Sequence, residues 1–337
     1  MLPLSGTLWA CAAKVGPALT AVVAAVAAPL VAPVIARDFP DPSILAVGKT
    51  YYAYSTSSVY GTTRRHVPVF QSTSASGPGA GKWADAGDAL PQLPAWVAKD
   101  RTGASSVWAP AVVSRGPGSY LLYFTAQDAK LNVHCIGVAT SSSPKGPFTP
   151  DGTTPLICRP QYRDSIDPMP FTDADGTRYL LYTSQNNGTT IWLQRLTPDG
   201  ITPVGQRRAL LTSDRPEEAQ VVEAPTLVRR GGKYILFYSG NRYNSGRYFI
   251  NYASASSLAG PFVKHPGTLL DGNTLNKKYA NPGGQEVVLG GTHDYLVFHA
   301  DIGRFQRGMF AAGLVWGKDG LPKVQLNGQS TPPSVQR

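Results

Sequence analysis

Five short segments of this chain repeat one strand pattern, and the repeat constrains the fold more than any other feature. Each segment begins with a tyrosine and continues with aliphatic or aromatic residues. The segments are 51–55, 120–124, 179–183, 234–238 and 295–299. Their first tyrosines lie 69, 59, 55 and 61 positions apart, a spacing that suits one four-stranded propeller blade per repeat.

The residues around these segments repeat as well. The first four are preceded by the glycine-containing turns VGKT, SRGPGS, TDADGTR and RRGGK, and further upstream by DPSIL, WAPAVV, DPMPF and EAPTLV. Glycine tolerates the positive φ of tight turns, so each unit predicts a β-hairpin whose first strand opens at a proline. A β-sandwich is the alternative, but the constant order of these parts favours an all-β, five-bladed propeller in a single domain over residues 37–325.

The two ends of the chain differ from the repeats. Residues 1–36 carry one charge, Lys14, and are apolar and alanine-rich from Val15 to Ile35. This pattern predicts an export leader and a secreted protein; a single membrane anchor is the alternative, and no later segment is long and apolar enough to span a bilayer. Residues 326–337 have few apolar side chains, which predicts a frayed terminus.

The charge and the cysteines narrow the function classes. The formal net charge is +10, but the basic residues are scattered and no nucleic-acid reader motif surrounds them, so we expect no nucleic-acid partner. Cys11 leaves with the leader. Cys135 and Cys158 then predict one disulfide in an oxidising compartment, with two buried thiols as the alternative.

Three acidic residues stand at the starts of first strands: Asp41, Asp167 and Glu223. In a propeller the innermost strands line a central channel, so we expect the three side chains to meet in one cavity despite their distance in sequence. Two carboxyl groups across a glycosidic bond can act as general acid and general base. A third carboxyl group nearby raises the pKa of the proton donor by like-charge repulsion.

The order DPS, WAP, IDP, EAP, each followed by an aromatic hairpin strand, resembles glycoside hydrolase family 43 over residues 37–323, including the closing segment RGMFAAGLVWGKDGLP. The resemblance implies a five-bladed propeller in which Asp41 is the general base, Glu223 the general acid and Asp167 the residue that orients the acid and adjusts its pKa. It also implies inversion at the anomeric carbon. For inversion we expect the carboxyls of Asp41 and Glu223 to lie roughly 6.5 to 9.5 Å apart.

The resemblance favours an α-L-arabinofuranosidase acting on plant-type or cell-wall polysaccharide. The alternatives are a β-xylosidase or an endo-arabinanase of the same family, and, in another class, a carbohydrate-binding propeller without activity. Further substrate contacts are predicted for Trp108, whose indole can stack on a sugar ring, and for Phe39. Arg307 falls where the family has a basic residue near the sugar, with Arg304 as the alternative.

The fifth repeat departs from the family. Family members often have a histidine at the fifth first strand that helps to hold a central metal ion. Here the sequence has Gln285, which we expect to reach the channel and contact substrate. We therefore predict no metal site from protein side chains, although calcium on the axis remains an alternative. His293 and His299 are expected to be structural. No phosphate-cradling motif predicts a nucleotide, flavin or haem cofactor.

Overall fold

The computed structural model describes residues 32–74, 77–185, 188–290 and 293–326. The described strands form five four-stranded antiparallel sheets, each built from consecutive segments of the chain. The first two sheets are β1 (Ser43–Val47), β2 (Thr50–Tyr54), β5 (Pro68–Thr73) and β6 (Ala84–Asp88), then β7 (Val107–Gly116), β8 (Ser119–Gln127), β9 (His134–Ser141) and β10 (Thr149–Pro150). The third and fourth are β11 (Ser165–Thr172), β12 (Arg178–Gln185), β13 (Thr189–Leu196) and β14 (Pro203–Thr212), then β15 (Val222–Arg230), β16 (Lys233–Gly240), β17 (Phe249–Ala255) and β18 (Val263–Lys264). The fifth is β19 (Gly283–Val288), β20 (Asp294–Gly303), β21 (Gln306–Trp316) and β22 (Pro322–Gln325).

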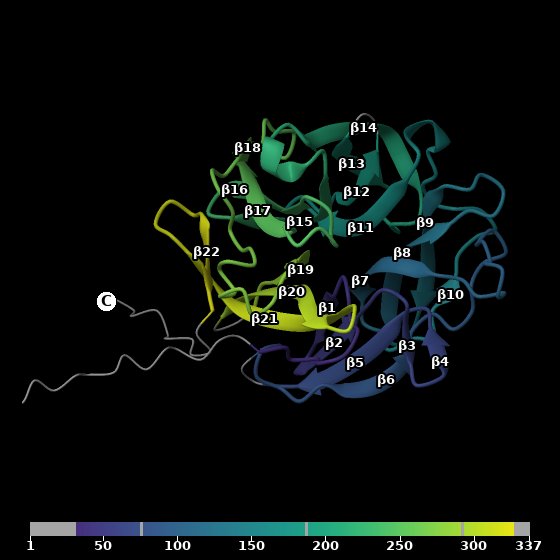
Figure 1. The fold of residues 1–337 in the computed structure, drawn as a ribbon. Helices are drawn as coiled ribbons and strands as arrows, with labels where there is room; N and C mark the ends of the chain where they lie inside the picture. The colour runs from purple at the N-terminus through teal and green to yellow at the C-terminus, as the bar shows by residue number, and fades with distance from the viewer. Residues whose placement is uncertain (1–31, 75–76, 186–187, 291–292, 327–337) are drawn as a thin grey trace, which may run out of the picture.

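The predicted five-bladed propeller is confirmed. The sheets lie around a central axis with β1, β7, β11, β15 and β19 innermost (Figure 1). The five aromatic segments are the second strands of the blades: β2, β8, β12, β16 and β20. The shorter hairpin of β3 (Ser58–Tyr60) and β4 (Thr63–Arg65) is inserted in the first blade, and two 3₁₀ turns, η1 (Pro160–Tyr162) and η2 (Pro216–Glu218), precede β11 and β15.

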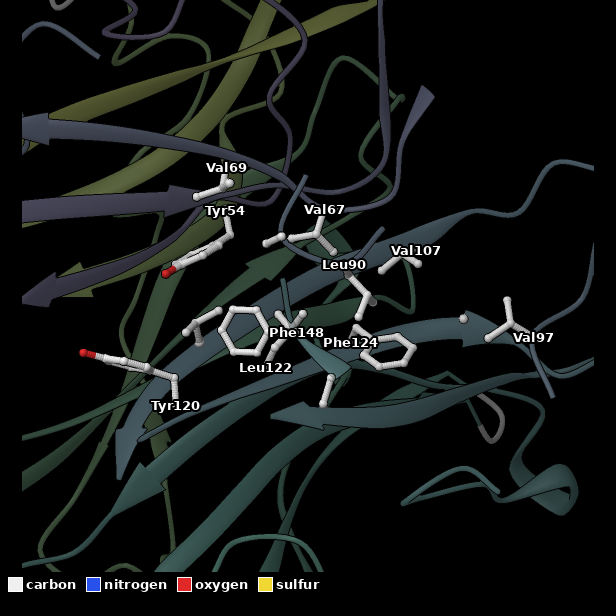
Figure 2. Close-up of a cluster of buried hydrophobic side chains, with 14 of the residues drawn as sticks. Tyr54, Val67, Val69, Leu90, Val97, Val107, Tyr120, Leu122, Phe124 and Phe148 are labelled. Atoms are coloured by element: carbon white, nitrogen blue, oxygen red, sulfur yellow. The ribbon is translucent and has the colours of Figure 1, made fainter. Parts of the chain in front are cut away.

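Second strands are apolar on both faces because each blade packs between two neighbours. In β8, all of residues 120–126 are buried. Between the first and second blades, Tyr54 and Val67 meet Leu122, Phe124 and Phe148 (Figure 2). Each fully buried side chain of this size stabilises the fold by about 1.5–3 kcal/mol, so the contacts between blades hold the ring closed.

The boundary of the domain lies earlier than predicted. Ile35, assigned above to the leader, is 4% exposed and forms a bridge with Met309 of β21. Its apolar side chain packs with Phe39 in the core, so the propeller begins before Arg37. The rest of the predicted leader, residues 1–31, and residues 327–337 of the predicted tail lie outside the described residues. Within the described part of the chain, no helix has the length and hydropathy to cross a membrane.

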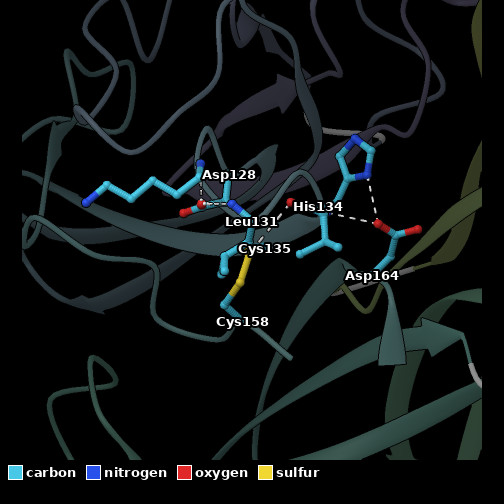
Figure 3. Close-up of a disulfide and its surroundings, with 8 residues drawn as sticks. Asp128, Leu131, His134, Cys135, Cys158 and Asp164 are labelled. Carbon is cyan, nitrogen blue, oxygen red and sulfur yellow. Dashed lines mark hydrogen bonds and ion pairs between the residues drawn. A yellow bond between two sulfur atoms is a disulfide. The ribbon is translucent and has the colours of Figure 1, made fainter. Parts of the chain in front are cut away.

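A disulfide joins Cys135 at the start of β9 to Cys158 in the segment that leads to η1. Beside it, the backbone nitrogen and Nδ1 of His134 lie 2.9 and 3.0 Å from one carboxylate oxygen of Asp164 (Figure 3). The predicted pairing of the two cysteines is thus present. It ties the start of β9, where His134 stacks on Trp108, to the segment that precedes β11.

Candidate active site

Each blade turns a left-handed corner where its first strand reaches the axis. The corner residues are Asp41, Ala109, Asp167, Ala224 and Gly284, with φ between 42° and 55°. In four blades the next residue is a proline. The pairing of the first and second strands is interrupted at this point in the second to fifth blades, so the corner aims its neighbouring side chains into the channel instead of along the ladder.

These corners correct one part of the sequence interpretation. Asp41 and Asp167 occupy the corner itself, whereas Glu223 stands one position before its corner, Ala224. The three acids therefore do not share one register. They still reach one cavity, because residues on both sides of a sharp corner can face the axis.

A left-handed conformation costs a non-glycine residue about 1–2 kcal/mol, and hydrogen bonds from the preceding blade hold each corner. The corner N–H groups of Ala109, Asp167 and Gly284 donate to the hydroxyls of Thr56, Thr125 and Ser239. In the remaining two blades the acceptors belong to the candidate site. The N–H of Ala224 donates to Asp167 Oδ2 at 2.9 Å, and that of Asp41 to His299 Nδ1 at 3.1 Å.

A cavity of about 300 Å³ opens at these corners and is lined by all five blades. Asp41, Asp167 and Glu223 all line it, as predicted from their places in the repeat. Two glycines make room for the surrounding side chains. A Cβ on Gly284 would lie 2.6 Å from His299 Nδ1 and 2.7 Å from Asp41 Oδ1, and a Cβ on Gly283 would collide with the ring of Tyr248.

Asp41 is held in its charged form. Burial alone would raise its pKa, but the Arg307 guanidinium, 3.5 Å from Oδ1, favours the charged form. The hydroxyl of Thr56 donates to Oδ2 at 2.6 Å and adds to the effect. Together they hold the pKa of this carboxyl well below its usual range, so Asp41 is an acceptor at neutral pH.

Glu223 has the opposite environment. Burial raises its pKa to about 7, the hydroxyl of Tyr248 opposes the shift by donating to Oε1 at 2.7 Å, and the negative charge of Asp41 adds to it. Burial also raises the pKa of Asp167 well above its usual value, and the neighbouring charges of Glu223 and Asp41 add to that rise. The cavity thus combines a carboxylate with a pair of carboxyls that retains a proton near neutral pH.

Of three further predicted contacts, two line the cavity and one does not. Trp108 lies at the cavity, 38% exposed, with its indole stacked on the His134 ring at a centroid distance of 3.9 Å. Arg307 also lines the cavity, under the ring of Tyr243. Phe39 does not line it: its side chain is fully buried edge-on against Phe70, and a substrate contact for Phe39 is wrong because no surface of the ring is accessible.

Gln285 and His299 are both buried side chains of the fifth blade. Gln285 lines the cavity but is 4% exposed, and its amide donates to the carbonyl of Ala224 and accepts from Ser239. It therefore braces the corner after Glu223. His299, expected to be structural, is fully buried beside Asp41. It pairs with Gly283 where other second strands carry threonine or serine.

The residues present do not form a metal cage by themselves. His299 Nε2 is buried and lacks a hydrogen-bond partner in the described structure. However, no three His, Cys, Asp or Glu side chains of the described residues converge as ligands. A hard cation such as calcium takes six to eight oxygen ligands, so the donor set of the described residues does not fit the ion.

An axial cavity that brings together a carboxyl with a lowered pKa and one with a pKa raised to about 7 contains the two kinds of group that glycoside hydrolysis uses. The family model for glycosyl hydrolases family 43 matches residues 31–322. The chain belongs to glycoside hydrolase family 43.

Relatives of this chain share most of its length. Extracellular endo-alpha-(1->5)-L-arabinanase 1 of Bacillus subtilis is 28% identical over 271 residues, covering 77% of this chain and 79% of the relative. Extracellular exo-alpha-(1->5)-L-arabinofuranosidase ArbA of Cellvibrio japonicus is 23% identical over 318 residues, covering 85% and 86%. The crystal structure of a thermostable family-43 glycoside hydrolase has a TM-score of 0.73 at 26% identity, covering 88% of this chain and 96% of that one.

Proposed function

We propose that this protein hydrolyses α-L-arabinofuranosyl linkages in arabinan-type glycans with inversion of the anomeric carbon. The observation that carries the proposal is that two carboxyls line one cavity in opposite surroundings: the Arg307 guanidinium lies 3.5 Å from Asp41 and holds its pKa well below its usual range, whereas burial raises the pKa of Glu223 to about 7. Inverting hydrolysis needs one group of each kind.

The roles follow from these protonation states. Glu223 donates its proton to the glycosidic oxygen as the bond to the anomeric carbon breaks. Asp41 accepts a proton from the water molecule that attacks the same carbon from the opposite face. Asp167 fixes the corner that follows Glu223 by accepting from the N–H of Ala224, and the coupled pair of Asp167 and Glu223 retains a proton near neutral pH. One water is consumed: its hydroxyl goes to the anomeric carbon and its other proton to Asp41, while the proton from Glu223 stays on the leaving hydroxyl, and exchange with solvent then restores both carboxyls.

The arabinan assignment rests on two relatives that cover most of this chain and whose names refer to α-1,5-linked L-arabinan. Cavity size favours a short binding site, since about 300 Å³ is at the low end for ligand pockets. Trp108 offers an indole face at the rim for a sugar ring. We accordingly favour exo action that releases arabinose, in a secreted enzyme like its extracellular relatives.

Endo action is the second candidate, because the relative from Bacillus subtilis is named an endo-arabinanase. Linear arabinan, an aryl α-L-arabinofuranoside and an aryl β-D-xyloside distinguish these functions. Arabinose released from arabinan in the first minutes, with the arabinofuranoside cleaved faster than the xyloside, is the expected result. Mixed oligosaccharides at early times would favour the endo enzyme. Binding of arabinan without hydrolysis would refute catalysis altogether.

Asp167→Asn should move the basic limb of the pH profile to lower pH. Glu223 acts while protonated, so activity falls as the pH rises through its pKa of about 7. In the native pair, loss of the last proton leaves two adjacent negative charges; with asparagine it leaves one, so the proton is lost more readily. Asparagine keeps an oxygen for the N–H of Ala224. The measurement is kcat/KM against pH, and an unmoved limb would remove Asp167 from this role.

Tyr248→Phe should move the same limb in the opposite direction. The Tyr248 hydroxyl donates to Glu223 and stabilises the charged carboxylate, which lowers the pKa of Glu223. Without that bond the proton is retained to higher pH. Tyr123→Phe is the matched control, since it removes another buried hydroxyl, bonded to the carbonyl of Gly200 in a different part of the ring. A downward shift for Tyr248→Phe, or equal shifts in both variants, would contradict the assignment.

A further inference from the structure

A second cavity of about 500 Å³ lies between the third and fourth blades. The first-strand end that reaches this second cavity is opposite to the end that carries the acidic residue. Glu223 is the second residue of β15 and Arg229 the eighth, so six residues, or roughly 20 Å of extended strand, separate the two cavities along β15. The groove is therefore on the far face of the propeller from the candidate active site.

Strand pairing brings two of the groove's arginines to one face of the third blade. Arg195 of β13 pairs with Tyr179 of β12, and Arg208 of β14 pairs with Leu193, two residues before Arg195 on the same face of β13. Across the groove, Arg229 of the fourth blade pairs with Tyr234. All of these residues line the cavity, which thus has a tyrosine beside an arginine on each of its two walls.

The three guanidinium groups have no acidic partner. Among the residues that the structure describes, none of Arg195, Arg208 and Arg229 forms an ion pair within 4.0 Å. Asp173 lines the groove, but both of its oxygens accept from the Tyr234 hydroxyl, at 2.9 and 3.0 Å. Asp175 lies near Arg195 and is bonded to Thr177 instead.

The groove therefore holds three positive charges against one lining carboxylate. Like charges placed close together on a sheet face destabilise each other, and a bound anion would relieve that repulsion. Guanidinium groups bind planar carboxylates through paired hydrogen bonds. The tyrosine rings add apolar faces on which a sugar ring can pack.

We propose that this far-face groove binds a uronic-acid-bearing segment of a glycan, as a site separate from the catalytic cavity. The choice of a glycan rests on the proposed function, because a glycan hydrolase can contact further sugars of its polymer outside the catalytic cavity, and the choice of a uronate rests on the three arginines of the groove. Arg195 and Arg208 on one wall and Arg229 on the other bind the uronate carboxylates, and the tyrosines contact the rings. Binding in this groove keeps the enzyme attached to its polymer while the catalytic cavity on the opposite face hydrolyses successive linkages.

Calorimetric titration with trigalacturonate tests the site. The variant Arg195→Gln/Arg208→Gln/Arg229→Gln should bind it at least about tenfold more weakly than the native protein, because it loses charge-assisted hydrogen bonds. The matched control Arg64→Gln/Arg101→Gln/Lys130→Gln removes the same charge from exposed positions outside the groove and should bind like the native protein. If the two triple variants lose affinity for trigalacturonate equally, net charge alone explains the loss, and the proposal of a binding site in the groove is refuted.

Competing probes separate the other occupants. Neutral arabinotriose should not displace trigalacturonate; displacement would place the uronate in the catalytic cavity and overturn the proposal. Inorganic phosphate or a thymidine oligonucleotide that binds as tightly as trigalacturonate would make the groove a general anion site or a nucleic-acid site, and each of these results contradicts the glycan assignment. Hydrolysis of an aryl arabinofuranoside should be unchanged in the groove variant. Absence of that hydrolysis in the native protein would refute the proposed function while leaving the uronate titration to be judged independently.

Discussion

Glu223→Gln should lower kcat on arabino-oligosaccharides by about 10³-fold, within the range expected for loss of a general acid. Glutamine fills the same volume and can still accept from Tyr248, but it cannot donate a proton to the leaving oxygen. A dinitrophenyl arabinofuranoside needs little protonation of its leaving group, so the loss on that substrate should be much smaller. Initial rates on the two substrates measure the difference.

Glu286→Gln provides the control for this experiment. Glu286 lines the same cavity, and burial raises its pKa to about 8, yet it has no part in the proposed scheme. We expect its variant to retain native activity. A large loss of activity for Glu286→Gln with little loss for Glu223→Gln would show that Glu223 is not the proton donor.

Asp41→Asn should lower kcat by about 10³-fold or more on both substrates. Asparagine cannot take a proton from the attacking water, and this step is needed whatever the leaving group. The ratio of the losses on the two substrates should therefore lie near one for Asp41→Asn and far from one for Glu223→Gln. Circular dichroism checks that the variant keeps its fold, since Asp41 also contacts His299 and Arg307. If the folded Asp41→Asn variant hydrolyses the dinitrophenyl substrate at the native rate, Asp41 is not the general base.

The sequence predicted the architecture because the repeat is periodic and apolar. A second strand buried on both faces needs aromatic and aliphatic residues throughout, and this pattern is visible at the tyrosines of all five units. The Asp-Pro and Ala-Pro pairs marked the points where first strands reach the axis. Asp41, Asp167 and Glu223 could be found for that reason, even though Glu223 precedes its corner by one residue.

The remaining site residues depend on features that a repeat does not specify. Tyr248 comes from the loop before β17 and reaches Glu223 because Gly283 leaves room for its ring. Phe39 lies two residues before the axial corner at Asp41, but its ring packs into the core. His299 had a usable signal: a histidine in the place where second strands of other blades carry Thr125, Thr183 and Ser239. Recognising that His299 occupies this place requires the pairing register of the first and second strands. The irregularities at the corners shift that register, so it cannot be read from the sequence alone.

The stereochemistry of the first product tests most directly whether a water activated by Asp41 attacks opposite the group protonated by Glu223. Proton NMR of an α-L-arabinofuranoside digest, recorded before the sugar mutarotates, should show β-arabinofuranose appearing first and the α anomer only later. Initial release of the α anomer would mean that two displacements occur at the anomeric carbon, and it would contradict the division of labour assigned to these two carboxyls.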